Sequence, residues 1–203
     1  MPVQSLWMST MFLFGAGASY GSGDCSPYCP PLERDLFPEL QRWGGVASTV
    51  ENPLREKFIV DFEKGMEEFY RHRNTDTTAF LREMAGYFAQ FKPGPKNYYG
   101  KLARIVAQAS GTVVLATTNY EMLIELALDG AGQGVAYGRP PQSIRKGIPL
   151  LKIHGSCNFL PDQERARIEG SSFCDSWLQE QDGTPVEDLE RHIYDGPAKS
   201  FRQ

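Results

Sequence analysis

Short, continuous apolar runs occur at three places along the chain and predict strands. They are Met11-Phe12-Leu13-Phe14, the β-branched run at 112–118, and the run from Pro149 to Ile153. A run that is apolar at successive positions fits a strand buried on both faces of a parallel sheet. Each run ends in a polar or glycine-containing turn, and ligands of parallel α/β sheets bind beyond the carboxyl ends of the strands. We therefore expect the chemistry of the protein to converge on one edge of the sheet.

Elsewhere, apolar residues recur at three- and four-residue spacing, which predicts amphipathic helices. The four predicted helices cover 54–73, 77–91, 97–109 and 120–128. Strands that alternate with helices indicate an α/β fold, here a Rossmann-like parallel sheet with helices on both faces and an inserted helical region. After Leu160 the sequence is polar and broken by glycine and proline, and only one further helix is expected, over 186–194.

The length and composition are those of an ordinary globular protein. With 203 residues, of which 41% are hydrophobic and 23% charged, the chain can bury a substantial core, and we expect one domain over 1–203. A net charge of -4 provides no general attraction to phosphate backbones, so no direct nucleic-acid contact is expected. The apolar run at Met11 is too short to span a bilayer and lacks a preceding basic segment, which predicts a cytoplasmic protein without membrane attachment.

Cysteine usage favours reduced, structurally incidental thiols. The four residues, Cys25, Cys29, Cys157 and Cys174, include no C-x-x-C pair. Cys25 and Cys29 are separated by three residues, which leaves a zinc site open as an alternative, but no second pair completes a tetrahedral set of ligands. We expect no bound metal.

The segment Gly15-Ala16-Gly17-Ala18-Ser19 follows the first predicted strand directly. Glycines at this place let the backbone approach a pyrophosphate and leave amide groups free to donate to it. The spacing matches the full dinucleotide fingerprint only if Gly21 is counted one position late. A tight turn between strand and helix therefore stays open as the alternative.

Polar motifs also end the other two predicted strands. Thr117-Thr118-Asn119-Tyr120-Glu121 places a carboxamide, which can donate and accept, at the sheet edge, although Asn119 could instead cap the following helix. Ile153-His154-Gly155-Ser156 places an imidazole where glycine leaves room for a substrate. Histidine is the side chain best suited to proton transfer near neutral pH, and a purely structural role for His154 is the alternative.

Taken together and in this order, the three motifs resemble those of the sirtuin superfamily, most closely the bacterial sirtuin-like NAD-hydrolase domains of antiphage defence proteins. In that family a G-A-G-A-S loop opens the domain, T-T-N-Y-D ends a central strand, and H-G-S supplies a histidine. The resemblance covers residues 10–160. It departs from the family at Glu121, where the family has Asp, and the later strands of a complete sirtuin fold are not evident between 160 and 203. The chain is therefore expected to be truncated or divergent after residue 160.

The resemblance implies that the protein hydrolyses NAD at the nicotinamide–ribose bond, releasing nicotinamide and ADP-ribose or a cyclic form. Asn119 would hold a water or the ribose hydroxyls, and His154 would accept a proton. The residues that it places around the cofactor are Gly15, Ala16, Gly17, Ala18, Ser19, Thr118, Tyr120, Glu121, Gly155 and Ser156.

Two other functions are compatible with the same motifs. A sirtuin-type NAD-dependent protein deacylase would need a small zinc module with two C-x-x-C pairs, which this sequence lacks. A non-catalytic NAD or ADP-ribose sensor would bind the nucleotide without cleaving it. Relatives in defence systems are held inactive until a threat is sensed, so the resemblance also implies assembly, either as a homo-oligomer or with a partner such as a translocase-type ATPase or an Argonaute-like protein.

Overall fold

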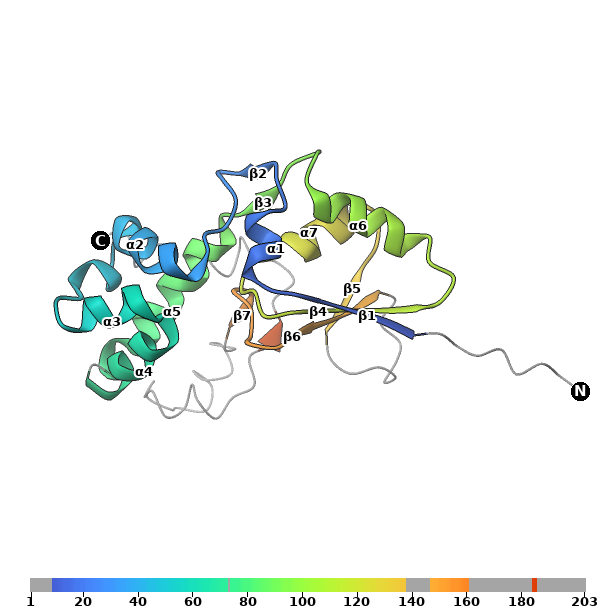
Figure 1. The fold of residues 1–203 in the computed structure, drawn as a ribbon. Coiled ribbons are helices and arrows are strands. Elements are labelled where there is room, and N and C mark those ends of the chain that lie inside the picture. Colours follow the sequence, from blue (N-terminus) through green and yellow to red (C-terminus); the bar gives the residue numbers. More distant parts are fainter. Residues whose placement is uncertain (1–8, 73, 138–146, 161–183, 186–203) are drawn as a thin grey trace, which may run out of the picture. The chain divides into compact units, whose positions relative to one another are not determined.

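The computed structural model describes residues 9–72, 74–137, 147–160 and 184–185, and the chain divides into two compact units (Figure 1). The sheet unit consists of residues 1–30 and 91–155, and the helical unit of residues 31–90 and 156–203. The helix expected over 186–194 lies outside the described residues, and the expectation of one domain over 1–203 stays a prediction. None of the helices in these described ranges is long and apolar enough to cross a membrane.

A parallel sheet of four strands forms the centre of the sheet unit, in the order β1-β4-β6-β5. The strands are β1 (Ser9–Phe14), β4 (Thr112–Thr117), β5 (Val135–Tyr137) and β6 (Ile148–Lys152). The mixed α/β class, the parallel sheet and the three predicted strands are thus confirmed. Only three residues form β5, too few for an apolar pattern to reveal a strand.

The register of the sheet brings three strand ends to the same level. Phe14 pairs with Thr117, and Thr117 pairs with Lys152. Two hydrogen bonds extend this alignment past the strands, because Thr118 N donates to Phe14 O at 3.1 Å and Ile153 N donates to Thr117 O at 2.9 Å. The glycine loop and the two polar motifs therefore begin at one edge of the sheet.

Three helices of the sheet unit lie on the same side of the sheet in Figure 1: α1 (Ala16–Tyr20), α6 (Tyr98–Ala107) and α7 (Leu123–Gly130). Apolar side chains of α6 and α7 are buried, as are Leu115 and Leu150 of the sheet. Helix α6 begins where the carboxamide of Asn97 accepts a hydrogen bond from Tyr99 N at 2.9 Å, an N-cap that satisfies one amide of the first turn. The apolar spacing over 97–109 and 120–128 predicted both helices to within three residues at each end.

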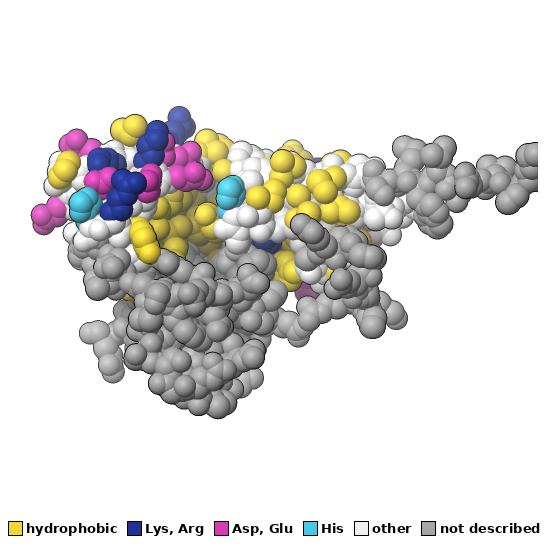
Figure 2. All heavy atoms as spheres, turned by 90° about the horizontal axis from the view of Figure 1, so that it is seen from below, with side chains coloured by type: hydrophobic (Ala, Val, Ile, Leu, Met, Phe, Trp, Pro, Cys, Tyr) yellow, Lys and Arg dark blue, Asp and Glu magenta, His cyan; other side chains and the backbone are white. Residues whose placement is uncertain are grey.

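Strand β1 lies at an edge of the sheet and exposes apolar side chains. Its only described partner strand is β4, and Met11 and Leu13 are 61% and 65% exposed. Figure 2 shows hydrophobic side chains on the face of the sheet unit that is turned toward the viewer. An apolar strand at the edge of a sheet is a surface that folded proteins usually cover.

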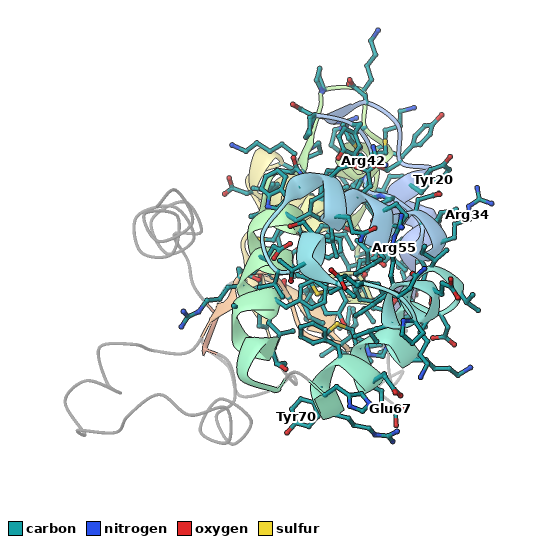
Figure 3. All side chains as sticks on the ribbon, turned by 90° about the vertical axis from the view of Figure 1, so that its left-hand side faces the viewer. Tyr20, Arg34, Arg42, Arg55, Glu67 and Tyr70 are labelled. Carbon is teal, nitrogen blue, oxygen red and sulfur yellow. The ribbon has the colours of Figure 1, made fainter. Side chains whose placement is uncertain are left out.

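The helical unit is built around phenylalanine rings. Its helices are α2 (Glu33–Trp43), the 3₁₀ turn η1 (Ala47–Thr49), α3 (Leu54–Val60), α4 (Phe62–His72) and α5 (Asn74–Ala89). Phe37 and Phe58 stack with ring centroids 4.2 Å apart, and Phe80 meets Phe58 edge-on at 5.8 Å. Phe69 packs on Phe80 at 5.1 Å, and all four rings are fully buried. Charged side chains such as Arg42 lie on the outside (Figure 3).

The helix expected over 54–73 is two helices, because the chain is extended at Asp61, with φ -156° and ψ 107°. Asp61 Oδ1 accepts a hydrogen bond from Lys64 N at 3.0 Å and so caps the start of α4. A side chain at Gly65 would overlap the ring of Phe58, and glycine therefore allows α4 to pack closely against α3. The apolar spacing continues across the break, which is why periodicity alone does not reveal it.

A carboxyl group is also buried in the helical unit. Glu83 is 3% exposed, and its Oε2 accepts a hydrogen bond from Val46 N at 2.7 Å. Burial raises the pKa of Glu83 to about 7. Gly45 has a φ of +67°, and a Cβ atom there would lie 2.5 Å from Glu83 Oε2, so this turn requires glycine for both reasons.

Two short antiparallel pairs complete the described structure. In the sheet unit β2 (Cys25–Ser26) pairs with β3 (Lys92–Pro93), and in the helical unit β7 (Phe159–Leu160) pairs with β8 (Thr184–Pro185). The β2–β3 pair therefore joins the two stretches of chain that precede and follow residues 31–90.

Candidate functional site

The carboxamide of Asn119 is held in one orientation by the glycine loop. Its Nδ2 donates to Gly15 O at 3.1 Å and to Ser19 Oγ at 2.7 Å. A backbone carbonyl can only accept, so Gly15 O determines which end of the amide faces the loop. The acceptor Oδ1 has no hydrogen-bond partner among the residues that the structure describes. The side chain of Asn119 therefore keeps one acceptor for a ligand.

The alternative role of Asn119, as the cap of the following helix, does not match this geometry. Helix α7 begins at Leu123, and the N–H of Leu123 donates to Glu121 Oε2 at 2.5 Å. Glu121 thus supplies the acceptor at the start of α7, while Asn119 is directed back to the first strand end.

Ser19 is at the centre of the hydrogen bonds that join these motifs. Its hydroxyl donates to Glu121 Oε1 at 2.5 Å, accepts from Asn119 and lies 3.0 Å from the Tyr99 hydroxyl. Burial raises the pKa of Tyr99, which keeps this phenol protonated. Ser19 is 1% exposed. The hydroxyl of Ser19 is therefore occupied inside the protein, where it positions Asn119, and the expectation that Ser19 lies against the cofactor stays a prediction.

Glu121 has a similar place. It is 3% exposed, and each of its carboxylate oxygens is engaged, one by Ser19 and one by Leu123 N. Both carboxylate oxygens are directed into the protein, so Glu121 joins α1 to the start of α7, and its expected contact with a cofactor stays a prediction.

A buried ion pair lies directly behind this network. The side chain of Lys152 is fully buried at the end of β6, with Nζ 3.2 Å from Glu125 Oε1, and it donates to the backbone oxygen of Glu121 at 2.5 Å. Burial raises the pKa of Glu125, and the neighbouring lysine opposes that shift. Tyr137 donates to the same carboxylate at 3.3 Å. Lys152 thus connects the end of β6 to the polar motif that follows β4.

Sequence reasoning gave no role to Lys152, Glu125 or Tyr99. One signal was available, because Glu121 and Glu125 are four residues apart on one face of the predicted helix 120–128, and a lysine ends the apolar strand that follows. Two carboxylates on a buried face need a cation nearby. Nothing in the sequence pattern points to Tyr99, which is 80 residues from its partner Ser19.

The glycine loop itself is open. Gly15, Ala16 and Gly17 are exposed, and a Cβ atom built on Gly17 would meet no other atom within 4 Å. The first amide groups of a helix have no intrahelical acceptor, so the start of α1 can donate to a bound anion. Internal packing does not require glycine at position 17, whereas close approach of a ligand would.

His154 stands on a turn beyond β6. Gly155 N donates to Lys152 O at 3.3 Å, and Gly155 has a φ of +88°, a conformation that favours glycine. His154 is exposed, and it follows Lys152 by the same two residues by which Asn119 follows Thr117. Within the described ranges, however, no hydrogen bond or ion pair joins His154 to Asn119. The structure brings the two motifs to neighbouring strand ends without joining these side chains.

The remaining predicted residues are only partly assembled. Thr118 is half-buried beside Gly15, since its Oγ1 lies 3.8 Å from the place of a Cβ atom there, and Ala18 is half-buried in α1. Tyr120 is 36% exposed. Ser156 belongs to the helical unit, so the structure does not combine it with the others.

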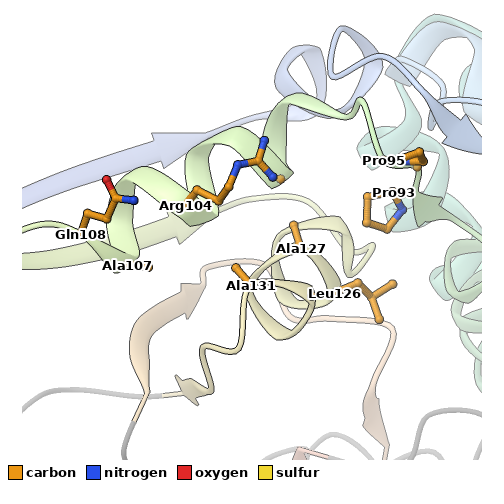
Figure 4. A pocket seen from close by; sticks show the side chains of 11 residues that line it. Pro93, Pro95, Arg104, Ala107, Gln108, Leu126, Ala127 and Ala131 are labelled. Atoms are coloured by element: carbon orange, nitrogen blue, oxygen red, sulfur yellow. The ribbon is translucent and has the colours of Figure 1, made fainter.

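A hollow of about 550 Å³ lies elsewhere in the sheet unit, between α6, α7 and the segment 93–95 (Figure 4). It is lined by small and apolar residues together with Arg104 and Gln108, and it contains none of the predicted site residues. This hollow and the polar network therefore do not coincide. We base the site on the network, because hydrogen bonds between buried side chains fix specific atoms, whereas the lining of the hollow offers a single charged side chain.

Among the described side chains no group of three or more His, Cys, Asp or Glu residues is arranged to hold a metal ion. Neither a protein-family profile nor a curated protein matches the sequence. The functional assignment therefore rests on the residues themselves.

Proposed function

We propose that the protein is a sirtuin-like NAD glycohydrolase, in which the helical segment 31–90 is an insertion into a Rossmann-like domain. The observation that carries this proposal is the fixed carboxamide of Asn119. Its donor atoms are occupied by Gly15 and Ser19, and its acceptor Oδ1 is left at the sheet edge beside an open glycine loop. An acceptor beside the exposed start of α1 matches a substrate that has hydroxyl groups and a pyrophosphate.

The proposed reaction requires little acid catalysis. Nicotinamide leaves NAD as a neutral base, and the bond breaks toward an oxocarbenium-like ribose that water or a ribose hydroxyl then captures. Asn119 Oδ1 accepts a hydrogen bond from that water or hydroxyl and orients it. His154 accepts the proton that the nucleophile releases, and the amides at the start of α1 bind the pyrophosphate. For hydrolysis, NAD and water thus yield nicotinamide, ADP-ribose and one proton.

The buried residues act by positioning. Ser19 and Glu121 fix the angle of the Asn119 amide, and Lys152 fixes Glu121 through its backbone oxygen. Such groups need to be held within a fraction of an ångström for the reacting atoms to align.

We also propose that the protein acts in bacterial antiphage defence and that its activity depends on assembly with itself or with a partner of the translocase ATPase or Argonaute-like kind. The exposed apolar side chains Met11 and Leu13 on edge strand β1 support an assembly surface. A second copy or a partner would cover that edge.

One observation favours a second candidate function, the NAD or ADP-ribose sensor. His154 is exposed and has no described contact with Asn119, so binding without cleavage is compatible with this arrangement. A sensor would use the glycine loop and Asn119 in the same way and would need no proton acceptor.

Nicotinamide release from NAD, measured across a series of protein concentrations, tests the proposal. We expect release to rise more steeply than protein concentration, and His154→Ala to lower it by about 10²-fold or more while NAD binding by calorimetry changes little. His72→Ala is the matched control, because His72 is also exposed but lies on α4 of the helical unit.

Three results would contradict the hydrolase proposal. Unchanged turnover in His154→Ala would show that His154 is not the proton acceptor. NAD binding without nicotinamide release at every protein concentration would identify a sensor. Release that needs an acetylated lysine peptide would identify a deacylase.

A further inference from the structure

Two thiols lie side by side in the loop that follows α1. The Sγ atoms of Cys25 and Cys29 are 3.2 Å apart, and both residues are partly exposed. Cys25 lies in β2, where pairing with Pro93 of β3 holds its backbone in place. A disulfide requires an S–S distance of about 2.0 Å, so the two sulfur atoms need to approach by only about 1.2 Å.

The surroundings of Cys25 are polar and well defined. Asn97 Nδ2 lies 3.2 Å from Cys25 Sγ, and the hydroxyl of Ser22 lies 3.3 Å from it. Asn97 is fully buried, and it also donates to Gly23 O at 2.5 Å. Cys25 Sγ is thus in contact with Asn97 and Ser22, and Cys29 Sγ lies beside it. Such a pair differs from isolated thiols, because the second sulfur is already in place when the first one reacts.

We infer that Cys25 and Cys29 are a site of reversible oxidation, which forms an intramolecular disulfide by exchange with a low-molecular-weight disulfide. A thiolate of the protein attacks one sulfur of the small disulfide, which breaks its S–S bond and releases one small thiol. The second cysteine then attacks the mixed disulfide and releases the other small thiol. The two cysteines lose two electrons and two protons, and the small disulfide is reduced to two thiols.

The order of attack follows from the environments of the two sulfurs. Burial raises the pKa of the Cys25 thiol to about 11, so Cys25 is almost entirely protonated near neutral pH. Cys29 therefore makes the first attack, and Cys25 resolves the mixed disulfide. This site is independent of the proposed NAD chemistry, and so is its test.

The sequence provides a direct assay. Tryptic cleavage gives one peptide, 1–34, that contains both thiols, because Arg34 is the first basic residue, whereas Cys157 and Cys174 fall in two other peptides. The full chain is equilibrated with oxidised and reduced glutathione, blocked with N-ethylmaleimide in denaturant and digested. Oxidation is expected to lower the doubly labelled form of peptide 1–34 by about tenfold. An unlabelled form should replace it, with a mass two hydrogens below that of the unlabelled peptide with two thiols. Dithiothreitol should restore the labelled form.

Two variants identify the direction of the reaction. Cys25→Ser removes the resolving thiol, so peptide 1–34 should retain one glutathione on Cys29. Cys29→Ser should leave Cys25 largely free and labelled. The inference is overturned if the unmodified chain keeps both labels, if it retains glutathione without closing the ring, or if peptide 1–34 is found cross-linked to the peptide of Cys157 or Cys174.

Discussion

The two units bury very different side chains at their centres. The helical unit buries phenylalanine rings, which have no polar atoms and need only to fill space. The sheet unit buries the hydrogen-bonded side chains Ser19, Asn119 and Glu121, with the pair Lys152–Glu125 behind them. Rings can repack in several ways at similar energy, whereas a buried polar network is satisfied in only one arrangement.

This difference indicates where orientation matters more than stability. Well-packed apolar side chains can often replace a buried ion pair without loss of stability, so packing alone does not require Lys152 and Glu125. Their presence beside the strand-end motifs is explained if the edge must hold specific atoms in place. The aromatic cluster carries no such requirement.

The largest expected effect comes from breaking the ion pair. Lys152→Met leaves the carboxylate of Glu125 buried without its cation, and we expect a loss of about 3–5 kcal/mol in the free energy of unfolding. Urea denaturation followed by circular dichroism measures it. The double variant Lys152→Met with Glu125→Leu should recover a large part of the loss, and a single variant as stable as the natural chain would show that the pair is unimportant.

A smaller effect is expected from Ser19→Ala. The substitution leaves Glu121 Oε1 and one hydrogen of the Asn119 amide without their partner, which should lower the free energy of unfolding by about 1–3 kcal/mol. Nicotinamide release should fall more than NAD affinity does, since the acceptor Oδ1 is no longer held. Ser48→Ala is the control, because the exposed hydroxyl of Ser48 bonds only to the nearby Gly45 O. Equal stability of the two variants would contradict a positioning role for Ser19.

The last expected effect is a pH dependence that comes from Glu83, a buried carboxyl group of the helical unit. The pKa of Glu83 is raised from 4.5 to about 7, so the folded chain keeps this proton over a pH range in which the unfolded chain has lost it. The free energy of unfolding should therefore fall as pH rises from about 4.5 to 7, and Glu83→Gln should lack this fall. Thermal unfolding of both proteins across this range measures the difference. The assignment is wrong if the natural chain becomes less stable relative to Glu83→Gln as pH falls from about 7 to 4.5.

Local patterns predicted much of the fold. Continuous apolar runs revealed β1, β4 and β6, and three- to four-residue spacing located α5, α6 and α7 and the stretch that holds α3 and α4, whereas α2 was not predicted. Helix α2 has Pro38 in its interior and follows a proline-rich loop, so its local signals are those of a turn. The break at Asp61 depends on a close contact between Phe58 and Gly65 that no periodicity records.

The site was predictable in its backbone and less so in its side chains. Strand ends of a parallel sheet meet at one edge, and this rule was enough to bring Asn119 and His154 to neighbouring positions. The inward direction of Ser19 was not predictable, because its partner Glu121 is 102 residues away and a serine after a glycine loop can point either way. In the sequence, Lys152 is an ordinary residue at the end of a strand, and its role depends on the neighbouring carboxylate of Glu125, which only the structure shows.

The β2–β3 pair has a consequence for how this protein can evolve. Asp24 O accepts a hydrogen bond from Gly94 N at 2.6 Å, and the rings of Tyr28 and Phe91 meet edge-on at 5.5 Å, so the two chain segments that flank residues 31–90 are held together within the sheet unit. Because the two ends of segment 31–90 are held together, the length of this segment has little effect on the conformational entropy that the rest of the chain loses on folding. Residues 31–90 are therefore a module that selection can lengthen, shorten or exchange while the strand ends stay in register.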